Sequence, residues 1–103
     1  MSHEVLAFDL GASGGRAVAG RLDGEQLTAI PLHRFPNDPV HLHRHLYWDI
    51  LRLFHEMKQG LRCAQQQGFR RLQSMGIDTW GLDFGLLGAN GELLGMPYHY
   101  RDA

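Results

Sequence analysis

Several features that would point to a specialised class of protein are scarce in this sequence of 103 residues. Its single cysteine, Cys63, excludes an internal disulfide framework and cannot by itself form a thiolate metal site. Ten lysines and arginines against eleven acidic residues give a formal net charge of −1, which provides no general attraction for nucleic acid or anionic lipid. No apolar run approaches the roughly 20 residues that span a bilayer, and no leader pattern opens the chain. We therefore expect a cytoplasmic protein without nucleic-acid or membrane partners.

The hydrophobic content of 44% is that of a soluble globular protein, and the length allows one core. Residues 5–8 are apolar at every position, which favours a central strand buried on both faces. Residues 17–19 predict a second strand, which ends at the two-residue hairpin signal Asp23-Gly24. Residues 26–35 predict a third strand, placed at a sheet edge because Pro31 lacks an N–H donor. The chain therefore begins with three antiparallel strands.

The hydrophobic period then changes to that of an amphipathic helix. Asp49 is a good N-cap, and Gly68 is a plausible C-terminal stop. Residues 72–78 predict a further buried strand. Residues 82–87 predict another strand, which the Asn90-Gly91 turn joins to residues 92–94 as a hairpin. The expected apolar stripe of the helix, at spacings of three and four, comprises Ile50, Leu53, Phe54, Met57, Leu61 and Ala64.

A glycine-rich turn, residues 11–15, follows the carboxylate of Asp9 at the end of the first predicted strand. Small residues let backbone N–H groups form a concave nest for an anion, to which Ser13 would add a hydroxyl and Arg16 a charge. Asp9 could hold Mg²⁺ through its bound waters. The spacing matches neither the P-loop nor the dinucleotide fingerprint, and a strand rather than a helix follows. A flexible hairpin without a ligand is the alternative.

A second group of polar and aromatic residues follows the strand predicted for residues 72–78. Ligands of open sheets gather at strand ends. Trp80 offers a flat surface for a sugar ring, and Gly81 permits close approach to a hydroxyl. Asp78 and Asp83 are possible acceptors for hydroxyls or for water near a metal. In the alternative interpretation, Trp80 and Phe84 are simply core residues.

Five segments in order resemble the N-terminal part of the rhamnulokinases, and the match covers the whole chain. They are residues 9–16 (Asp-Leu-Gly-Ala-Ser-Gly-Gly-Arg), 33–37 (His-Arg-Phe-Pro-Asn), 47–50 (Tyr-Trp-Asp-Ile), 76–84 (Gly-Ile-Asp-Thr-Trp-Gly-Leu-Asp-Phe) and 100–102 (Tyr-Arg-Asp). The resemblance implies an α/β fold, the N-terminal part of an actin-like (ribonuclease-H-like) ATPase lobe. It also implies transfer of the ATP γ-phosphoryl group to the 1-hydroxyl of L-rhamnulose in L-rhamnose degradation, with ATP and Mg²⁺ as cofactors.

The resemblance also implies roles for individual residues. Gly81 would contact the sugar, with Trp80 and Asp83 as further candidates, and Asp9 would lie beside Mg²⁺, through water. The sequence departs from the family at Gly14, where rhamnulokinases usually carry a second serine, so we expect a looser turn and weaker phosphate binding. The residues implied for the ATP phosphate turn are Ala12, Ser13, Gly14, Gly15 and Arg16.

The resemblance makes residues 1–103 part of the N-terminal lobe of a carbohydrate kinase, with the second lobe absent. The general base of the family is an Asp in an Asp-Gln-Gly loop beyond position 103, so no catalytic base is expected in this chain. We therefore expect the isolated chain to be inactive, since losing a general base alone costs about 10²–10⁴-fold. A complementary C-terminal lobe or self-association would cover its unfinished sheet. The alternative is a non-enzymatic interaction module that retains a degenerate nucleotide turn.

Overall fold

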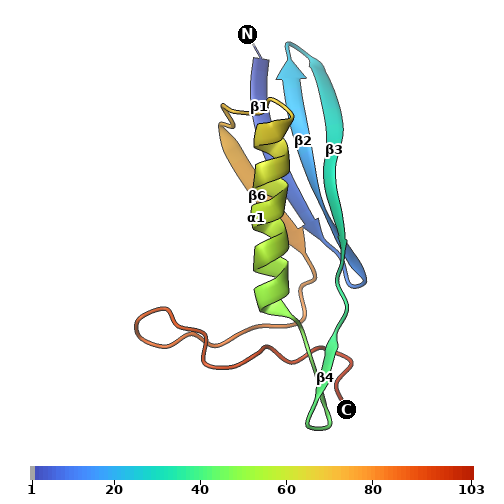
Figure 1. The fold of residues 1–103 in the computed structure, drawn as a ribbon, viewed down its shortest axis with the longest axis vertical. Helices are drawn as coiled ribbons and strands as arrows, with labels where there is room; N and C mark the ends of the chain where they lie inside the picture. The colour runs from blue at the N-terminus through green and yellow to red at the C-terminus, as the bar shows by residue number, and fades with distance from the viewer. Residues whose placement is uncertain (1) are drawn as a thin grey trace.

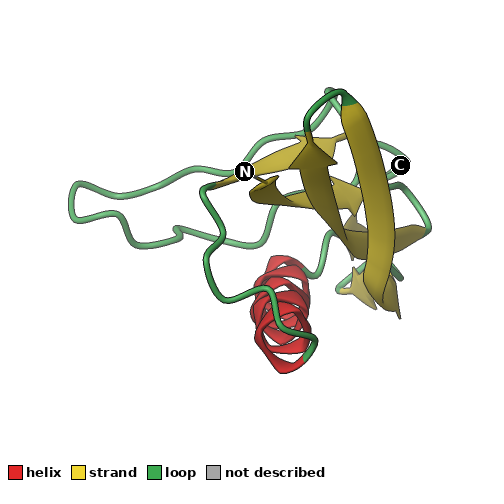
Figure 2. Ribbon diagram, turned by 90° about the horizontal axis from the view of Figure 1, so that it is seen from above, coloured by secondary structure: helices red, strands yellow, loops and turns green. Residues whose placement is uncertain are grey.

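The computed structural model describes residues 2–103, in which a four-stranded sheet carries one long helix on one face (Figures 1 and 2). The strand order is β3-β2-β1-β6, with β6 parallel to β1 and the other neighbours antiparallel. The predicted antiparallel start and the α/β class are therefore confirmed. The elements of this layer are β1 (Ser2–Leu10), β2 (Gly14–Asp23), β3 (Gln26–Pro36), α1 (Ile50–Gln66) and β6 (Ser74–Thr79).

The central strand β1 buries only one of its faces. Leu6, Phe8 and Leu10 are buried beneath α1, whereas Ala7 between them is exposed. The central position was predicted correctly, but burial on both faces was wrong. An apolar run shows that both faces tolerate burial, and here the described residues supply a covering layer for one face only.

The β2–β3 hairpin differs by one residue from the predicted turn. Its loop is Gly24-Glu25, because Asp23 pairs with Gln26, and Gly24 has a φ of 64°. A glycine at the first of two loop residues with positive φ suits a type II′ turn, whose twist matches the flanking strands. Strand β3 lies at the sheet edge, as Pro31 predicts, and a register shift between Ala17 and Val18 accompanies it.

Both ends of α1 follow from the residues that the sequence analysis singled out. The carboxylate of Asp49 accepts a hydrogen bond from the Arg52 backbone N–H at 3.2 Å. At the other end Gly68, with φ 95°, donates to the Gln65 carbonyl, and Phe69 donates to the Ala64 carbonyl. This pair of bonds is the Schellman arrangement.

Across residues 2–103, no helix combines the length and apolar composition that a membrane crossing needs.

The buried face of α1 only partly matches the predicted stripe. Leu53 and Ala64 are buried as expected, but Phe54 is 60% exposed and Leu61 is 40% exposed. Their places against the sheet are taken by Glu56 and Gly60. A Cβ at position 60 would lie 2.8 Å from the Ala17 Cβ, so the helix approaches the sheet as closely as glycine allows. This close approach, which hydrophobicity does not encode, sets the rotation of the helix.

A two-stranded hairpin that the sequence analysis did not predict joins the sheet to α1. It consists of β4 (Val40–Leu42) and β5 (His45–Tyr47). Its loop residues His43 and Arg44 have φ values of 50° and 70°. Positive φ at both positions of a two-residue loop is typically met by Asn-Gly or Asp-Gly, so this turn lacks the usual signal.

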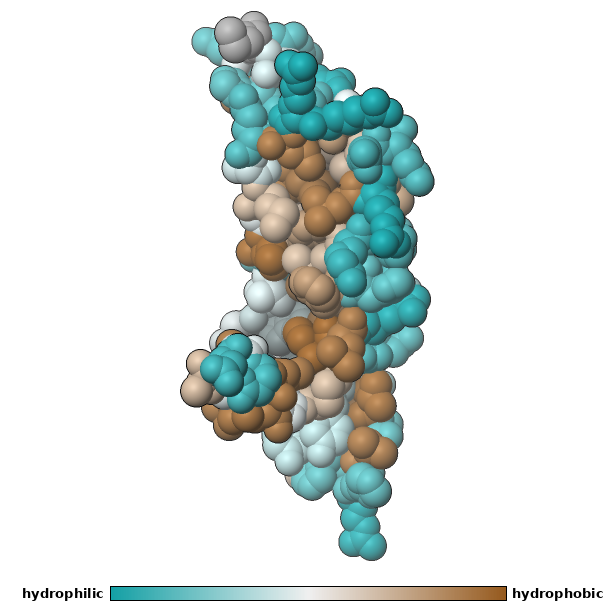
Figure 3. All heavy atoms as spheres, turned by 60° about the vertical axis from the view of Figure 1, so that its left-hand side comes forward, coloured by the Kyte–Doolittle hydropathy of each residue, from teal (hydrophilic) through white to brown (hydrophobic). Residues whose placement is uncertain are grey.

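Strand β6 was predicted to be buried, but all six of its residues are exposed. It occupies the sheet edge beside β1 (Figure 1). Met75 and Ile77 retain more than half of their surface, 56% and 53%. Figure 3 shows hydrophobic side chains gathered along this side of the molecule. The prediction of burial was wrong for this chain because no described element covers that edge.

The predicted strand over residues 82–87 is absent, although its turn forms. Gly91 has a positive φ of 84°, and the Leu94 N–H donates to the Leu86 carbonyl at 3.0 Å. Only an isolated bridge joins Leu87 to Leu93. Residues 80–95 therefore form an irregular hairpin that projects from the sheet (Figure 1).

Candidate functional site

The glycine-rich turn connects β1 to β2 and is closed by its own backbone. The Gly11 N–H donates to the Gly14 carbonyl at 2.9 Å. Ala12, Ser13 and Gly14 are exposed, whereas Gly15 is buried. A hollow of about 490 Å³ borders the turn and is also lined by Asp9, Arg16 and Arg34. The five residues predicted to hold phosphate follow one another at this turn. The backbone of the turn and the cationic side chains of Arg16 and Arg34 border the hollow.

The segment after β3 supports this turn, a role that the sequence analysis did not assign. The Asn37 side-chain amide donates to the Gly11 carbonyl at 2.8 Å, and the Asn37 backbone N–H donates to the Ser13 carbonyl at 3.3 Å. Asn37 is only 2% exposed. The ring of Phe35 covers Gly15, where an added Cβ would lie 2.3 Å from a ring carbon. The segment His-Arg-Phe-Pro-Asn was the available signal for this support.

Gly14 has room for a larger residue. The nearest atom to an added Cβ would be the Phe35 carbonyl oxygen at 3.6 Å, an ordinary contact distance. The serine usual in rhamnulokinases would therefore fit without displacing the backbone, and Gly14 is not required by packing. Its effect on phosphate binding stays a prediction.

Asp9 and Arg16 pair with each other across β1 and β2. The Asp9 carboxylate lies 3.2 Å from the Arg16 guanidinium, and the two residues are register partners. About half of each side chain is exposed, 47% for Asp9 and 52% for Arg16. An exposed ion pair contributes little stability, about 0–1 kcal/mol, so either partner can turn to a ligand at small cost.

The second predicted group meets the first at the same end of the sheet. Asp78 on β6 is the register partner of Asp9 on β1, so the two carboxylates lie on neighbouring strands. Because β1 and β6 are parallel, the carboxyl ends of both strands lie at the same end of the sheet. The structure thus brings together Asp9, the glycine turn and the start of the segment that holds Trp80 and Gly81.

Trp80 lies against another tryptophan rather than standing free. Its ring stacks on Trp48 with 3.8 Å between ring centroids, and Trp48 itself is 1% exposed. Trp80 is half-buried and also borders a small hollow of about 210 Å³ beside Leu53 and Asp83.

Phe84 is 77% exposed, so its alternative interpretation as a core residue was wrong. Gly81 is exposed, with no atom within 4 Å of an added Cβ.

The Asp83 carboxylate is engaged by the protein itself. One oxygen, Oδ2, accepts hydrogen bonds from the Trp48 indole N–H and from the Tyr100 backbone N–H, the latter at 3.0 Å. These bonds tie the segment after β6 to the end of the chain. The geometry gives Asp83 a positioning role towards Trp48, and its predicted contact with a sugar hydroxyl stays a prediction.

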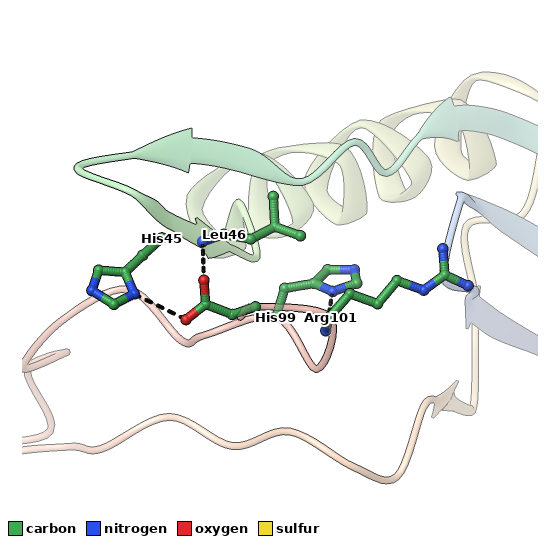
Figure 4. A network of polar contacts seen from close by, with 5 residues as sticks. His45, Leu46, His99 and Arg101 are labelled. Carbon is green, nitrogen blue, oxygen red and sulfur yellow. Dashed lines mark hydrogen bonds and ion pairs between the residues drawn. The ribbon is translucent and has the colours of Figure 1, made fainter.

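A polar network fastens the end of the chain to β5 (Figure 4). The Asp102 carboxylate accepts a hydrogen bond from the Leu46 backbone N–H at 2.7 Å and lies 2.9 Å from His45 Nδ1. The hydrogen bond with His45, followed by that from Leu46, lowers the pKa of Asp102 below its ordinary value. His99 Nδ1 accepts from the Arg101 backbone N–H at 3.0 Å. Tyr100 and Arg101 are thereby held near the turn, where they line a hollow with Ser13 and Asn37.

The sequence of this chain is similar to those of curated sugar kinases. No protein-family model matches the sequence. A rhamnulokinase from Bacteroides thetaiotaomicron is 42% identical over 102 residues, which are 99% of this chain and 21% of that protein. One from Mannheimia succiniciproducens is 43% identical over 100 residues, or 95% of this chain and 20% of the relative. The chain thus spans about one fifth of the length of the curated relatives it matches.

Solved structures agree on the fold. A gluconate kinase from Lactobacillus acidophilus superposes with a TM-score of 0.76 at 13% identity, covering 99% of this chain and 20% of that one. A xylulose kinase from the same organism gives 0.75 at 13% identity, covering 97% of this chain and 20% of that one. The fold is therefore that of the actin-like sugar kinases, as predicted. The sequence corresponds to the N-terminal portion of the rhamnulokinases, and the resemblance to that family is confirmed.

Proposed function

We propose that this chain provides the phosphate-binding turn and part of the sugar site of an ATP-dependent rhamnulokinase. The observation that carries the proposal is that the carboxyl ends of β1 and β6 lie next to each other. The turn between β1 and β2 lies beside the Asp9–Arg16 pair, and Asp78 on β6 is in register with Asp9. The reaction would transfer the γ-phosphoryl group of ATP to the 1-hydroxyl of L-rhamnulose. Such transfer depends mainly on positioning and on electrostatic stabilisation of the phosphoryl oxygens.

Sugar kinases of this family use ATP and Mg²⁺. The residues assigned to the phosphates are Ala12, Ser13, Gly14, Gly15 and Arg16. Asp9 fits a metal held through water, because its carboxylate is 47% exposed at the end of its strand. Mg²⁺ would neutralise phosphate charge there. Arg16 would orient a phosphate oxygen, and backbone N–H groups of the turn would complete the donors.

Gly81, Trp80 and Asp83 are the residues assigned to the sugar side. The absence of atoms near an added Gly81 Cβ supports close approach of a ligand to the backbone. Trp80 would contribute an aromatic surface, with Trp48 stacked behind it. Asp83 would act by fixing Trp48 and the Tyr100 backbone, which it already contacts.

We propose further that residues 1–103 are part of one lobe and transfer no phosphoryl group when isolated. The chain spans about one fifth of its rhamnulokinase relatives. The resemblance places the general base outside these residues, and phosphoryl transfer requires groups from both sides of a closed cleft. A complementary C-terminal lobe would supply them.

Titration of the isotope-labelled chain, followed by NMR, tests the binding part of this proposal. MgATP should shift the amide signals of Ser13 and Arg16, and L-rhamnulose should shift that of Gly81. Gly24, in the hairpin loop at the other end of β2, is the internal control and should not move. Each ligand alone should bind weakly, since the chain spans only about one fifth of its rhamnulokinase relatives. Silence at all three site residues, with the amide spectrum of a folded chain, would contradict the proposal.

The alternative function is a non-enzymatic interaction module. The observation that favours it is the exposed edge strand β6, whose six residues are all accessible and which could pair with another chain. Sedimentation distinguishes the two proposals in combination with the titration. Concentration-dependent association without any response to MgATP or L-rhamnulose would favour the interaction module. A response to both ligands would favour the kinase.

The size of the natural product tests the assignment to one lobe. An antibody against the N-terminal segment should detect, in the native cells, a species several times heavier than 11.7 kDa if this chain is the front of a complete kinase. A native species of 11.7 kDa would instead require a partner chain for activity.

A further inference from the structure

A row of four charged residues crosses the whole sheet beside the glycine turn. In the strand order β3-β2-β1-β6 the row reads Arg34, Arg16, Asp9 and Asp78, and each residue is the register partner of the next. Register partners project from the same face of a sheet. Their neighbours along the strands, Phe8, Ala17 and Phe35, are buried on the helix side, so the charged row lies on the opposite, uncovered face.

The two cations of this row differ in their partners. Arg16 is paired with Asp9 at 3.2 Å, whereas Arg34 forms no ion pair with any of residues 2–103. Arg34 is exposed and lies beside Arg16 on the neighbouring strand. Like charges directly opposite each other in a sheet are destabilising. This arrangement therefore leaves an uncompensated positive charge next to the turn.

The position of Arg34 also relates it to the hollow at the turn. Arg34 lines this hollow together with Asp9, Arg16 and residues of the glycine turn. The charges of Asp9 and Arg16 cancel. The three residues of the row on β3, β2 and β1 therefore carry a net positive charge, which is that of Arg34. A guanidinium presents a planar fork of donors that matches phosphate oxygens in a bidentate manner.

We propose that Arg34 is a second phosphate-binding side chain of this site, acting beside Arg16 on the polyphosphate end of the nucleotide. This inference rests on the proposed function and adds a residue to it. Arg34 approaches the phosphates from β3, while the turn approaches them from the β1–β2 connection. The anion between them removes the repulsion of the two arginines, and binding of the polyphosphate thus stabilises the hairpin.

Binding of MgATP, of inorganic tripolyphosphate and of adenosine to the 103-residue chain tests this role. Arg34→Gln should raise the Kd for MgATP and for tripolyphosphate about tenfold or more, the loss expected for one charge-assisted hydrogen bond. It should leave adenosine binding unchanged and reduce the salt dependence of polyphosphate binding by about one ion. Arg71→Gln, at an exposed arginine in the loop before β6, is the matched control and should change each Kd by less than about twofold.

Two further measurements keep the inference separate from the proposed function. If Arg16→Gln weakens polyphosphate binding but Arg34→Gln behaves like Arg71→Gln, the role of Arg34 is overturned and the phosphate turn stands. If the folded wild-type chain binds neither MgATP nor tripolyphosphate, the phosphate turn itself is overturned. The Arg34 side-chain Nε–H signal of the wild-type chain, followed by NMR, requires no variant. It should shift with tripolyphosphate, and a stationary signal at saturation would overturn the role even if Arg34→Gln failed to fold.

Discussion

Residues 2–79 and residues 80–103 are held together in different ways. The first region has a hydrogen-bonded sheet of four strands, a capped helix and buried residues between them. The second region follows an irregular path with one isolated internal bridge, Leu87 to Leu93 (Figures 1 and 2). Its Leu82 and Phe84 are 73% and 77% exposed, while His99 is buried. A short segment can therefore be positioned by a few anchored side chains while most of its apolar surface stays uncovered.

Trp48 links the two regions through several contacts. It stacks on Trp80 and packs against His99, and its indole N–H donates to Asp83. Its backbone N–H donates to the Pro97 carbonyl at 2.9 Å. One buried residue before α1 thus contacts both the segment after β6, which includes the proposed sugar residues, and the segment around Pro97 and His99.

The largest expected effect is that of Trp48→Ala. Removing this buried ring should cost about 3–5 kcal/mol of unfolding free energy and release residues 80–103 from the sheet. Urea denaturation measures the cost, and amide exchange of residues 98–102 measures the release. Leu86→Ala is the control, since Leu86 is 62% exposed and its truncation should cost less than about 0.5 kcal/mol. Unchanged protection of residues 98–102 in Trp48→Ala would refute the link.

Overpacking beneath α1 should have the next largest effect. In Gly60→Val the added Cβ alone would lie 2.8 Å from Ala17 and 2.9 Å from Phe8, so we expect a loss of about 1–3 kcal/mol. Arg62→Val, on the exposed side of the same helix, is the control that places the same side chain in α1 where the helix faces solvent. Gly95→Val, with no atom within 4 Å of its added Cβ, carries the same change into the second region. Equal denaturation midpoints for all three variants would show that the helix does not approach the sheet this closely.

A smaller effect, of opposite sign, is expected at the β4–β5 turn that supports the second region. Arg44 has a φ of 70°, which glycine adopts without steric cost, so Arg44→Gly should stabilise the chain by about 0.5–1 kcal/mol. The same change at Arg62 in the exposed part of α1 should destabilise by a similar amount. Thermal or urea midpoints that move in the same direction for both variants would contradict the left-handed conformation at Arg44.

The smallest effect is the acid sensitivity of the end of the chain. The pKa of Asp102 is lowered from its ordinary 3.8, chiefly by the hydrogen bond with His45. Its stabilising contribution is therefore complete above pH 3.8 and is lost as the pH falls through the lowered pKa of the folded state. The Ala103 and Leu46 amide signals should follow this titration while those of β1 do not. In Asp102→Asn the titration should disappear, and its persistence would assign it to another group.

Local signals in the sequence predicted the first region well. Asp49 and Gly68 marked both ends of α1, and Pro31 placed β3 at the edge, because each acts through backbone chemistry that needs no distant partner. Burial was less predictable. β6 is apolar enough for a core strand yet lies open, because burial depends on the covering layer rather than on the strand.

The candidate site shows the same division. The contiguous glycine turn and its neighbours Asp9 and Arg16 could be identified from adjacent residues. The support that Asn37 gives to Gly11, and the alignment of Arg34 with Arg16, join residues far apart in the chain. Register and loop closure create these contacts. The segment that contains Arg34 and Asn37, residues 33–37, could be identified as a motif in the sequence, but its physical role could not be predicted.

The sequence by itself determined the first three strands, the helix with its caps, the strand that follows it, the phosphate-turn candidate and the resemblance to rhamnulokinases, since all of these rest on neighbouring residues. Only the tertiary structure decided which helix face is buried, what Asp83 contacts and which charges share one row of the sheet. Gly60 sets the helix against Ala17, and Trp48 draws in Asp83. Such contacts depend on strand register and interatomic distance, and these arise when the whole chain packs.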